Sequence, residues 1–290
     1  GDAVLAMRTL WLANAINIVL GPFFIFGLGP FPEMGVTGAA VATNIGRGIG
    51  VLYQLWHLAG HNSRVRVRWR HYAPALDVMK TIITTSGNGI LQMLIATTSW
   101  IGLFKILSAF GSAAIAGYTI AIRIVVFALM PAWGLANAGA TLVGQNLGAQ
   151  QPDRAETAVR IATRFNALFL GIVGAVFVIL AYPLTSLFTT DPQTHSHAAR
   201  GLWIVSLAFP LYAAGMCFGA AFNGAGDTWT PTRLNFVCFW LCQVPLAWFL
   251  AEVAGIGVLG VFISMPISFS AYAFWSGLLF KGGKWKLQKI

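Results

Sequence analysis

The side chains best suited to handling an ion in this chain are amides set within long uncharged stretches. Asn14 and Asn17 lie three residues apart, so both project from one face of a helix. Buried amides of this kind hydrate and orient an ion or a proton carrier, which predicts an ion-coupling role for Asn17 and Asn14. The alternative is a hydrogen bond between helices, which stabilises a membrane protein by about 0.6 kcal/mol.

A second group of side chains suits the binding of varied amphipathic molecules. Aromatic and methionine side chains repack around different ligands, and aromatic faces attract organic cations. Each member has an alternative role in the core or against lipid, where Trp and Tyr are common anchors. The predicted substrate cavity consists of Gln92, Trp100, Tyr118, Trp133, Asn137, Tyr212, Met216 and Gln243.

Pro131 and Gly134 form the best candidate for a hinge. Proline removes a backbone hydrogen bond and bends a helix, and the glycine three residues later adds freedom. Bending at this point would open and close a cleft. The alternative is a static kink of the sort that packed membrane helices tolerate.

The sequence offers little for other chemistries. Cys238 and Cys242 share a helical face, but no histidine is near enough to complete a zinc site. No nucleotide-binding Walker motif and no Ser/His/Asp order is visible. We therefore expect neither an enzyme, nor a metal site, nor a cofactor.

Composition defines the elements that must position these residues. The chain has 290 residues, of which 57% are hydrophobic and 9% charged, against about 25% charged in soluble domains. A spanning helix needs about 20 mostly apolar residues. The sequence therefore predicts an all-α polytopic membrane protein, which excludes soluble enzymes and free nucleic-acid binders. The expected helices are 5–28, 35–58, 78–107, 113–146, 158–189, 199–222, 230–251 and 256–280.

Acidic residues stand outside these helices or at their ends. A charge at membrane depth is costly, so an embedded carboxylate would mark a functional site. Because no predicted span contains one, these residues supply no titrating acid within the membrane. The eight acids are Asp2, Glu33, Asp77, Asp153, Glu156, Asp191, Asp227 and Glu252.

Basic residues predict the orientation. With the eight helices above, 14 lysines and arginines fall on one side and Arg200 alone falls on the other. The positive-inside rule makes the richer side cytoplasmic. The net charge of +10 is thus mainly an orientation signal. We expect a multi-pass protein of the inner or plasma membrane, with the basic loop 59–77 and the C-terminus in the cytoplasm.

An internal repeat indicates the larger architecture. Residues 1–8 read GDAVLAMR and residues 226–233 read GDTWTPTR, each before an apolar helix. After a short turn follow GVTGA at 35–39 and GVLGV at 257–261. Such parallel repeats are related by an axis along the membrane normal. If four helices precede the first hairpin as they precede the second, the chain is the last two-thirds of a protein with twelve spans.

This repeat divides the chain into three parts. Residues 1–58 are expected to be the last two helices of an N-terminal lobe. Residues 59–77 would form a basic cytoplasmic loop between lobes. Residues 78–290 would form a six-helix C-terminal lobe.

Several runs resemble MATE-type multidrug exporters. They are NIVL at 17–20, IFGLGPFPE at 25–33, GVTGAA at 35–40, LVGQNLGA at 142–149 and GAGDT at 224–228. The resemblance covers nearly the whole chain, and its most specific element is the run at 142–149. The family consists of twelve-helix secondary antiporters with two six-helix lobes, which expel organic cations and other amphipathic drugs in exchange for protons or sodium ions.

The resemblance also implies roles for individual residues. Asn17 and Thr43 match positions that help the ion site, whereas Gly21 stands where members often have an aspartate. Gln92 and Tyr212 are the nearest matches to acids that some members carry in the second lobe. A key acid lies on the family's first helix, which has no counterpart here. The resemblance therefore favours proton coupling through the first lobe over sodium coupling through the second.

Three alternatives stay open. A lipid-linked saccharide flippase of related architecture would need a strongly cationic cavity, for which only Arg47 and Arg123 could supply the charge. A multispan membrane enzyme would need a cluster of ionisable or metal-binding groups. The chain by itself could also be inert. The expected partners are a small amphipathic substrate and the lipid bilayer, without nucleic acid, and the protein is expected to be a monomer.

Overall fold

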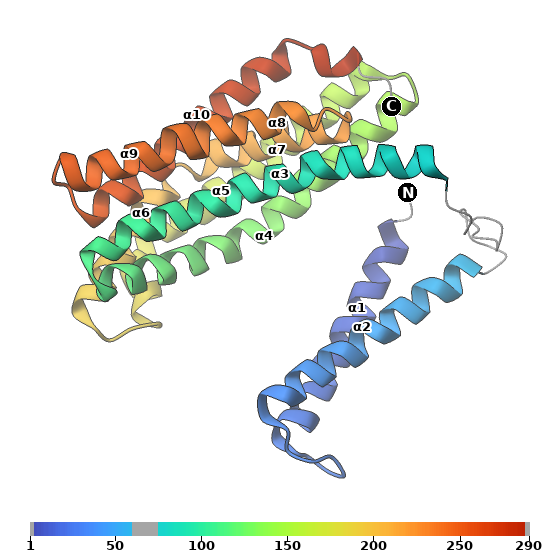
Figure 1. Ribbon diagram of the computed structural model, residues 1–290, viewed down its shortest axis with the longest axis horizontal. Helices are drawn as coiled ribbons and strands as arrows, with labels where there is room; N and C mark the ends of the chain where they lie inside the picture. Colours follow the sequence, from blue (N-terminus) through green and yellow to red (C-terminus); the bar gives the residue numbers. More distant parts are fainter. Residues whose placement is uncertain (1–2, 60–74, 288–290) are drawn as a thin grey trace. The chain divides into compact units, whose positions relative to one another are not determined.

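The computed structural model describes residues 3–59 and 75–287. Over these residues the chain is helical and contains no strand, which confirms the predicted all-α class. The chain divides into two compact units, Gly1–Met79 and Lys80–Ile290 (Figure 1). Residues 60–74, which include most of the predicted basic loop, lie outside the described residues.

The first unit is a helical hairpin of α1 (Ala3–Phe26) and α2 (Gly35–Ala59). Small residues recur at every fourth position of α2 and are all buried: Gly38, Ala42, Gly46 and Gly50. A Cβ atom at Gly46 would lie 2.6 Å from the carbonyl oxygen of Ala13. The two backbones therefore approach closely along this stripe, as small residues allow in membrane helices.

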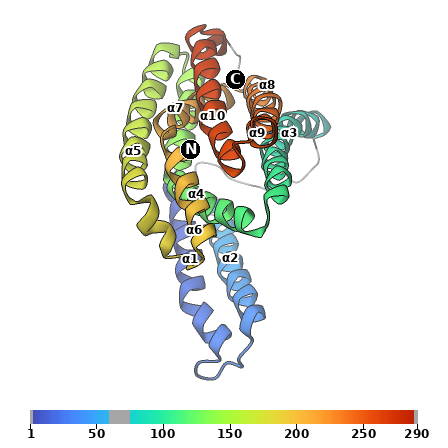
Figure 2. The ribbon, with the colours of Figure 1, turned by 90° about the vertical axis from the view of Figure 1, so that its left-hand side faces the viewer.

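The second unit begins with three long helices and a bent pair. These are α3 (Leu76–Leu107), whose first residues belong to the other unit, α4 (Ser112–Gly148), α5 (Pro152–Ser186), α6 (Pro192–Ser206) and α7 (Phe209–Gly224). α4 contacts α5, α6 and α7, and its buried face joins the core of the unit. The bundle can be followed in Figure 2.

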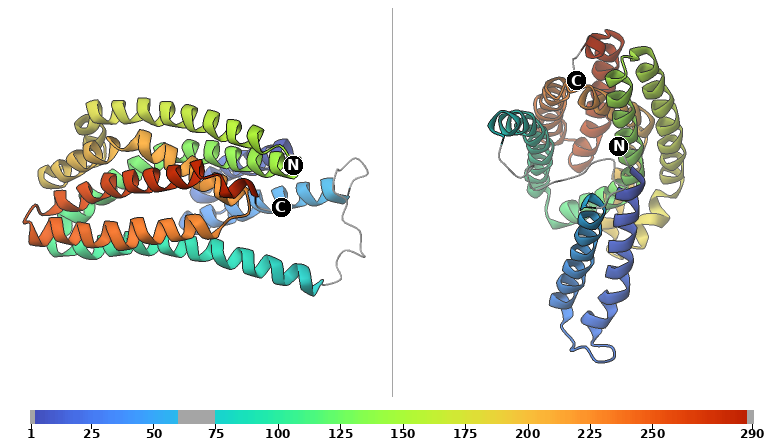
Figure 3. Two further views of the ribbon diagram at one scale, coloured as in Figure 1. Left: turned by 90° about the horizontal axis from the view of Figure 1, so that it is seen from above. Right: turned by 90° about the vertical axis from the view of Figure 1, so that its right-hand side faces the viewer.

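The last two spans form a second hairpin. The first of them combines α8 (Trp229–Asn235), a π-helical stretch (Phe236–Gln243), α9 (Val244–Trp248) and a further π-helical stretch (Phe249–Val253). The second is α10 (Val258–Lys281), followed by a 3₁₀ turn (Lys284–Leu287). The left panel of Figure 3 shows α3 beside the first of these spans. The indole of Trp240, in the π-helical stretch Phe236–Gln243, donates a 3.0 Å hydrogen bond to Thr98 Oγ1 of α3.

The structure corrects the predicted helices in two places. α5 begins at Pro152 instead of 158, because proline is well suited to a first helical turn. The helix expected at 199–222 starts earlier and is broken into α6 and α7, which are bent by 58°. Within the described residues, six helices are long and apolar enough to span a membrane, or seven with the bent pair. α2 is not among them, since it contains Asn44 and Arg47.

The two hairpins use matched glycines in the same way. Gly35 and Gly257 both have positive φ, of 53° and 68°, where the second helix of each hairpin begins. Three residues later, a Cβ atom at Gly38 would lie 2.2 Å from the Phe24 carbonyl oxygen. At Gly260 it would lie 2.6 Å from the Leu250 carbonyl carbon. The repeated Gly-x-x-Gly thus turns the chain and seats the returning helix on its partner.

Candidate functional site

Two residues of the predicted ion site meet in the first unit. The side-chain amide of Asn17 donates a 2.8 Å hydrogen bond to Oγ1 of Thr43. The Thr43 hydroxyl in turn donates to the Ala39 carbonyl oxygen at 2.8 Å. Both side chains are half-buried. This chain of bonds orients Asn17 across the gap between α1 and α2.

Asn14 takes a different position. Its side chain is exposed and lines a groove of about 630 Å³ with Met7, Trp11 and Ile18 of the same helix. The structure therefore joins Asn17 with Thr43 and leaves Asn14 on an outward apolar surface of α1.

A stripe of polar side chains runs along α4. Trp133, Asn137, Thr141 and Gln145 follow one another at intervals of four residues, and all four are exposed. Residues four apart are neighbours on a helix surface. We call these four residues the α4 stripe. It contains two members of the predicted cavity set, Trp133 and Asn137.

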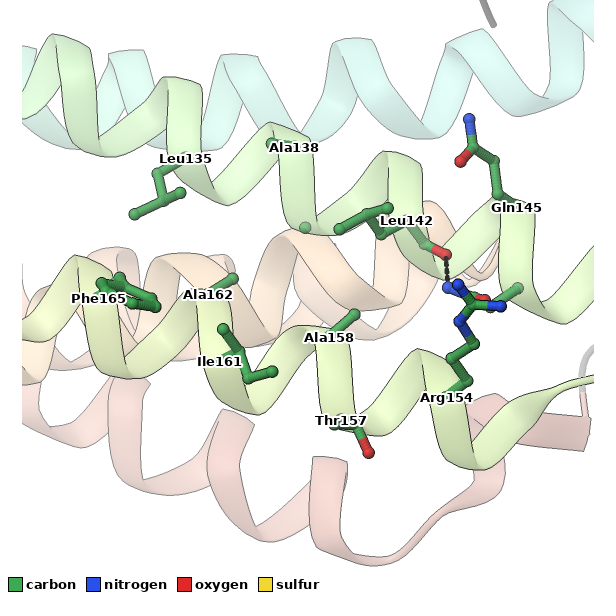
Figure 4. Close-up of a pocket in the computed structure, with 12 residues that line it drawn as sticks. Leu135, Ala138, Leu142, Gln145, Arg154, Thr157, Ala158, Ile161, Ala162 and Phe165 are labelled. Carbon is green, nitrogen blue, oxygen red and sulfur yellow. Dashed lines mark hydrogen bonds between the residues drawn. The ribbon is translucent and has the colours of Figure 1, made fainter.

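Beside the α4 stripe lies a groove of about 600 Å³ between α4 and α5 (Figure 4). Small residues form part of its lining, including Ala138 and Ala158, and Leu135 and Phe165 lie at its apolar end. At its other end lie Gln145 of α4, whose side chain points away from α5, and Arg154 and Thr157 of α5. One groove therefore offers an apolar wall and a polar, basic mouth.

An aromatic group connects α4, α7 and α10. The Tyr212 ring stacks on Phe269 with centroids 4.1 Å apart. The Trp133 side chain lies next to the Tyr212 side chain. Phe239 of the π-helical stretch meets the edge of Phe269 at 6.1 Å. Two predicted cavity residues, Trp133 and Tyr212, are thus in contact, and the α4 stripe ends at this group.

Three other predicted cavity residues lie in the core. Tyr118 has no exposed surface and packs against the rings of Phe104 and Phe262, and its hydroxyl has no hydrogen-bond partner within residues 3–59 and 75–287. Gln243 is 1% exposed, and its Nε2 atom also has no partner. Met216 is buried in the same core. None of the three is among the residues that line the groove between α4 and α5, and their place in the predicted cavity stays a prediction.

Gln92 and Trp100 lie on α3. Gln92 is half-buried, and 36% of Trp100 is exposed. Among the described residues, neither side chain makes a ring contact with the aromatic group, and neither lines the groove between α4 and α5. Their place in the predicted cavity stays a prediction.

Asn166 is a further buried polar residue that was not predicted from the sequence. This residue is fully buried in α5, and its Nδ2 atom donates to the Ala213 carbonyl oxygen and to Cys217 Sγ, both at 3.4 Å. Its Oδ1 atom has no partner, and neither does Thr163 Oγ1 one turn earlier. A single asparagine between Arg164 and Asp191 could have been noticed as a polar residue inside an apolar span.

The predicted hinge is not the place where the structure bends. α4 continues as one helix through Pro131, and a Cβ atom at Gly134 would meet nothing within 4 Å. The clear breaks are the 58° bend before Pro210 and a non-helical residue at Leu180, three residues before Pro183. The hinge role of Pro131 and Gly134 stays a prediction.

Metal ligands do not gather in the part of the chain that the structure describes. Its residues 3–59 and 75–287 contain no group of three His, Cys, Asp or Glu side chains that could hold a metal ion. Cys217, Cys238 and Cys242 are free thiols.

The sequence is similar to a family model and to curated proteins. The family model described as MatE matches residues 89–249. The chain is 29% identical over its full length to a probable multidrug resistance protein NorM of Thermotoga maritima. It is 26% identical, over 92% of its length, to a FAD transporter of Shewanella oneidensis. The chain spans 62% and 59% of these two relatives, so it corresponds to part of their length.

Solved structures give the same result. A MOP superfamily transporter from Pyrococcus furiosus matches 98% of this chain with a TM-score of 0.88 and 25% identity, and the match covers 64% of that protein. A MATE protein in the bent conformation matches 98% of this chain with a TM-score of 0.85 and 26% identity, over 63% of its own length. This likeness confirms the predicted fold class.

Proposed function

Since this chain belongs to the MatE family, whose members are transporters, we propose that the whole protein is a secondary active antiporter. It exports drugs, organic cations or related amphipathic metabolites in exchange for H⁺ or Na⁺. Export proceeds by alternating access between two lobes. Two relatives are named for a multidrug resistance role and a FAD transport role, so a broad cargo range within one fold is reasonable.

The observation that carries this proposal is the α4 stripe. Polar side chains are costly against lipid and therefore face a protein interior or a water-filled cavity. Asn137, Thr141 and Gln145 are exposed on a helix that is long and apolar enough to span the bilayer. We infer that the α4 stripe borders the aqueous path of the substrate.

The aromatic group at the end of the α4 stripe supplies the part of the binding site that adapts to different substrates. Trp133 is 39% exposed, and its neighbour Tyr212 is half-buried on Phe269. Ring faces attract organic cations and slide against planar drugs without fixed hydrogen bonds. Gln92, Trp100, Asn137 and the core residues Tyr118, Met216 and Gln243 complete the proposed cavity set.

For ion coupling we propose the pair of Asn17 and Thr43, with Asn14 nearby on α1. The amide oxygen of Asn17 would face the ion or the proton-carrying group while Thr43 holds its nitrogen. Gln92 and Tyr212 are uncharged, so coupling through H⁺ in the first lobe is preferred to Na⁺ in the second. No cofactor is needed for this mechanism.

The arrangement in the membrane is also part of the proposal. Residues 1–58 belong to the N-terminal lobe, 59–77 to the basic loop between lobes, and 78–290 to the C-terminal lobe. The loop and the C-terminus face the cytoplasm of a cell whose inner or plasma membrane holds the protein as a monomer. The ratio of 14 basic residues to one supports this orientation.

Ethidium accumulation in cells producing the full-length protein tests the function. We expect an energy-dependent decrease in accumulation that an uncoupler abolishes. Asn137→Leu and Tyr212→Ala should change the ranking of several exported compounds, whereas Ile179→Ala, at a position 76% exposed on apolar α5, should not. Absence of energy-dependent efflux, for FAD as well as for ethidium, would reject the proposal.

A further inference from the structure

A second groove lies away from the α4 stripe, where α5, α7 and α10 meet. Its volume is about 330 Å³. Phe218, Phe274, Gly277 and Leu278 line it, and Arg160 and Lys281 stand beside them. We call it the α5–α10 groove.

The surface around the α5–α10 groove differs in kind from the α4 stripe. Every exposed residue of α10 before Lys281 is apolar. The most exposed are Phe274 at 61% and Trp275 at 52%. A helix face with this composition is suited to lipid chains, so the groove opens toward lipid.

At the end of α10 this apolar face changes abruptly to positive charge. Lys281 is the last residue of α10, and Lys284 and Lys286 follow in the 3₁₀ turn. Trp285 is 1% exposed and stacks on Phe280 with centroids 4.9 Å apart. The turn is therefore held against the bundle by Trp285, which keeps its lysines at this end of α10.

The local acids neutralise only some of these cations. Glu156 accepts hydrogen bonds from Arg160 and from Lys286, which also pairs with Asp153 at 3.2 Å. Lys281 has no carboxylate partner among residues 3–59 and 75–287. Asp153 and Glu156 thus pair with Arg160 and Lys286 but not with Lys281 or Lys284, and a positive charge remains next to the groove.

We propose that the α5–α10 groove binds a phospholipid whose head group carries a net negative charge. The phosphate lies between Arg160 and Lys281, and one acyl chain runs along Phe274, Gly277 and Leu278. Basic pockets between membrane helices recognise anionic head groups in this way. A free anion would use the two cations but would leave the apolar wall uncovered.

The glycine in the groove gives the acyl chain its space. A Cβ atom at Gly277 would lie 3.3 Å from Cε2 of Phe218, so a larger side chain there narrows the groove. Gly277 lies four residues before Lys281, one helical turn or about 6 Å along the axis. This spacing places the chain contact directly beside the head-group contact.

The test measures lipid binding to the whole protein, purified and stripped of lipid in a neutral detergent. Native mass spectrometry counts bound phosphatidylglycerol and, separately, zwitterionic phosphatidylcholine. We expect the double variant Arg160→Gln with Lys281→Gln to weaken phosphatidylglycerol binding roughly 30-fold, since each basic residue near a membrane surface contributes about tenfold or less. Lys284→Gln, an exposed lysine that does not line the groove, should change it less than about twofold.

Further variants separate the two parts of the site. Gly277→Leu keeps both cations and should weaken phosphatidylglycerol binding, while glycerol phosphate added alone should bind detectably to neither protein. Equal losses in the double variant and in Lys284→Gln would overturn the proposal, as would equal affinity for phosphatidylcholine. Tight binding of glycerol phosphate alone would also overturn it. A thermal melt of each variant checks folding, and the lipid readout does not depend on transport.

Discussion

Thr43 stands between Asn17 and the backbone of its own helix: its Oγ1 atom accepts the Asn17 amide at 2.8 Å and donates to the Ala39 carbonyl at 2.8 Å. The hydroxyl hydrogen is therefore donated to the backbone, and a lone pair of the same oxygen accepts the Asn17 amide. Removal of this one oxygen would free the Asn17 side chain to rotate. The pair is thus a structural support for an amide that we propose to contact the coupling ion.

This arrangement predicts different results for two substitutions of Thr43. Thr43→Val removes the acceptor and should cost about 0.6 kcal/mol of stability, the average for such bonds in one membrane protein. It should also shift the pH dependence of ethidium export, because Asn17 loses its orientation. Thr43→Ser keeps the oxygen and should behave as the native protein does. Export assays across pH and thermal melts check both, and identical pH profiles for Val and Ser would reject the coupling role.

Tyr118 provides a test of whether a predicted cavity residue acts as core. Its hydroxyl is buried without a partner, and an unsatisfied buried polar group costs stability. Tyr118→Phe should therefore leave the free energy of unfolding unchanged or raise it by about 1 kcal/mol. Tyr118→Ala should lower it by about 3–5 kcal/mol, the usual result for a large core aromatic.

The export profile of Tyr118→Phe then separates the two roles. A core residue predicts the same relative export of ethidium and other drugs as the native protein. A selective loss for one drug, at unchanged protein abundance, would show that the hydroxyl meets substrate in another conformation.

Much of the fold could be predicted because charge is so unevenly distributed. The uncharged run from Arg200 to Asp227 locates a span whatever its internal shape. Its bend could not be predicted, because it depends on packing between distant helices. A Cβ atom at Gly174 of α5 would lie 2.8 Å from the Ser206 carbonyl oxygen, so α5 approaches the end of α6 closely just before the break.

The candidate site was less accessible to sequence reasoning. Residue type selected Trp133 and Tyr212, but their contact depends on which face of α4 turns toward α7. The sequence also does not show which face of α4 carries Tyr118, so this residue was grouped with Trp133 and Tyr212 although it lies in the core. Asn166 escaped notice because one amide gives no spacing pattern. The spacing of apolar residues predicts where a helix lies more reliably than it predicts which elements pack against that helix.

Gly134 allows the hinge prediction to be tested without damaging the packing. A methyl group there meets nothing within 4 Å, and alanine in a helix interior is more favourable than glycine by about 0.5–1 kcal/mol. Gly134→Ala should therefore raise the melting temperature. If α4 bends at this point during transport, the same change should slow export.

Gly89→Ala is the matched control for that experiment. Gly89 lies in α3 and is equally open, with nothing within 4 Å of a Cβ atom. It should raise stability without slowing export. If both variants export at the native rate, α4 does not need to bend at Gly134.

Lys286 gives the last prediction, on pH. Its hydrogen bond to Glu156 raises the pKa of the Lys286 ammonium above its usual 10.5. A raised pKa means that this contribution to stability is complete below pH 10.5 and is lost as pH rises through the folded value. Because the pair lies at the protein surface, with about a quarter of the Lys286 side chain exposed, the contribution should be about 1 kcal/mol or less and should weaken in salt. Thermal melts should therefore show Lys286→Gln less stable than the native protein at pH 7, with the difference vanishing in strong alkali or in 1 M salt.

Lys284→Gln is the control, because Lys284 makes no ion pair among the described residues. This variant should be as stable as the native protein at every pH. If it loses as much stability as Lys286→Gln, general surface charge holds the C-terminal turn, and the pair with Glu156 does not.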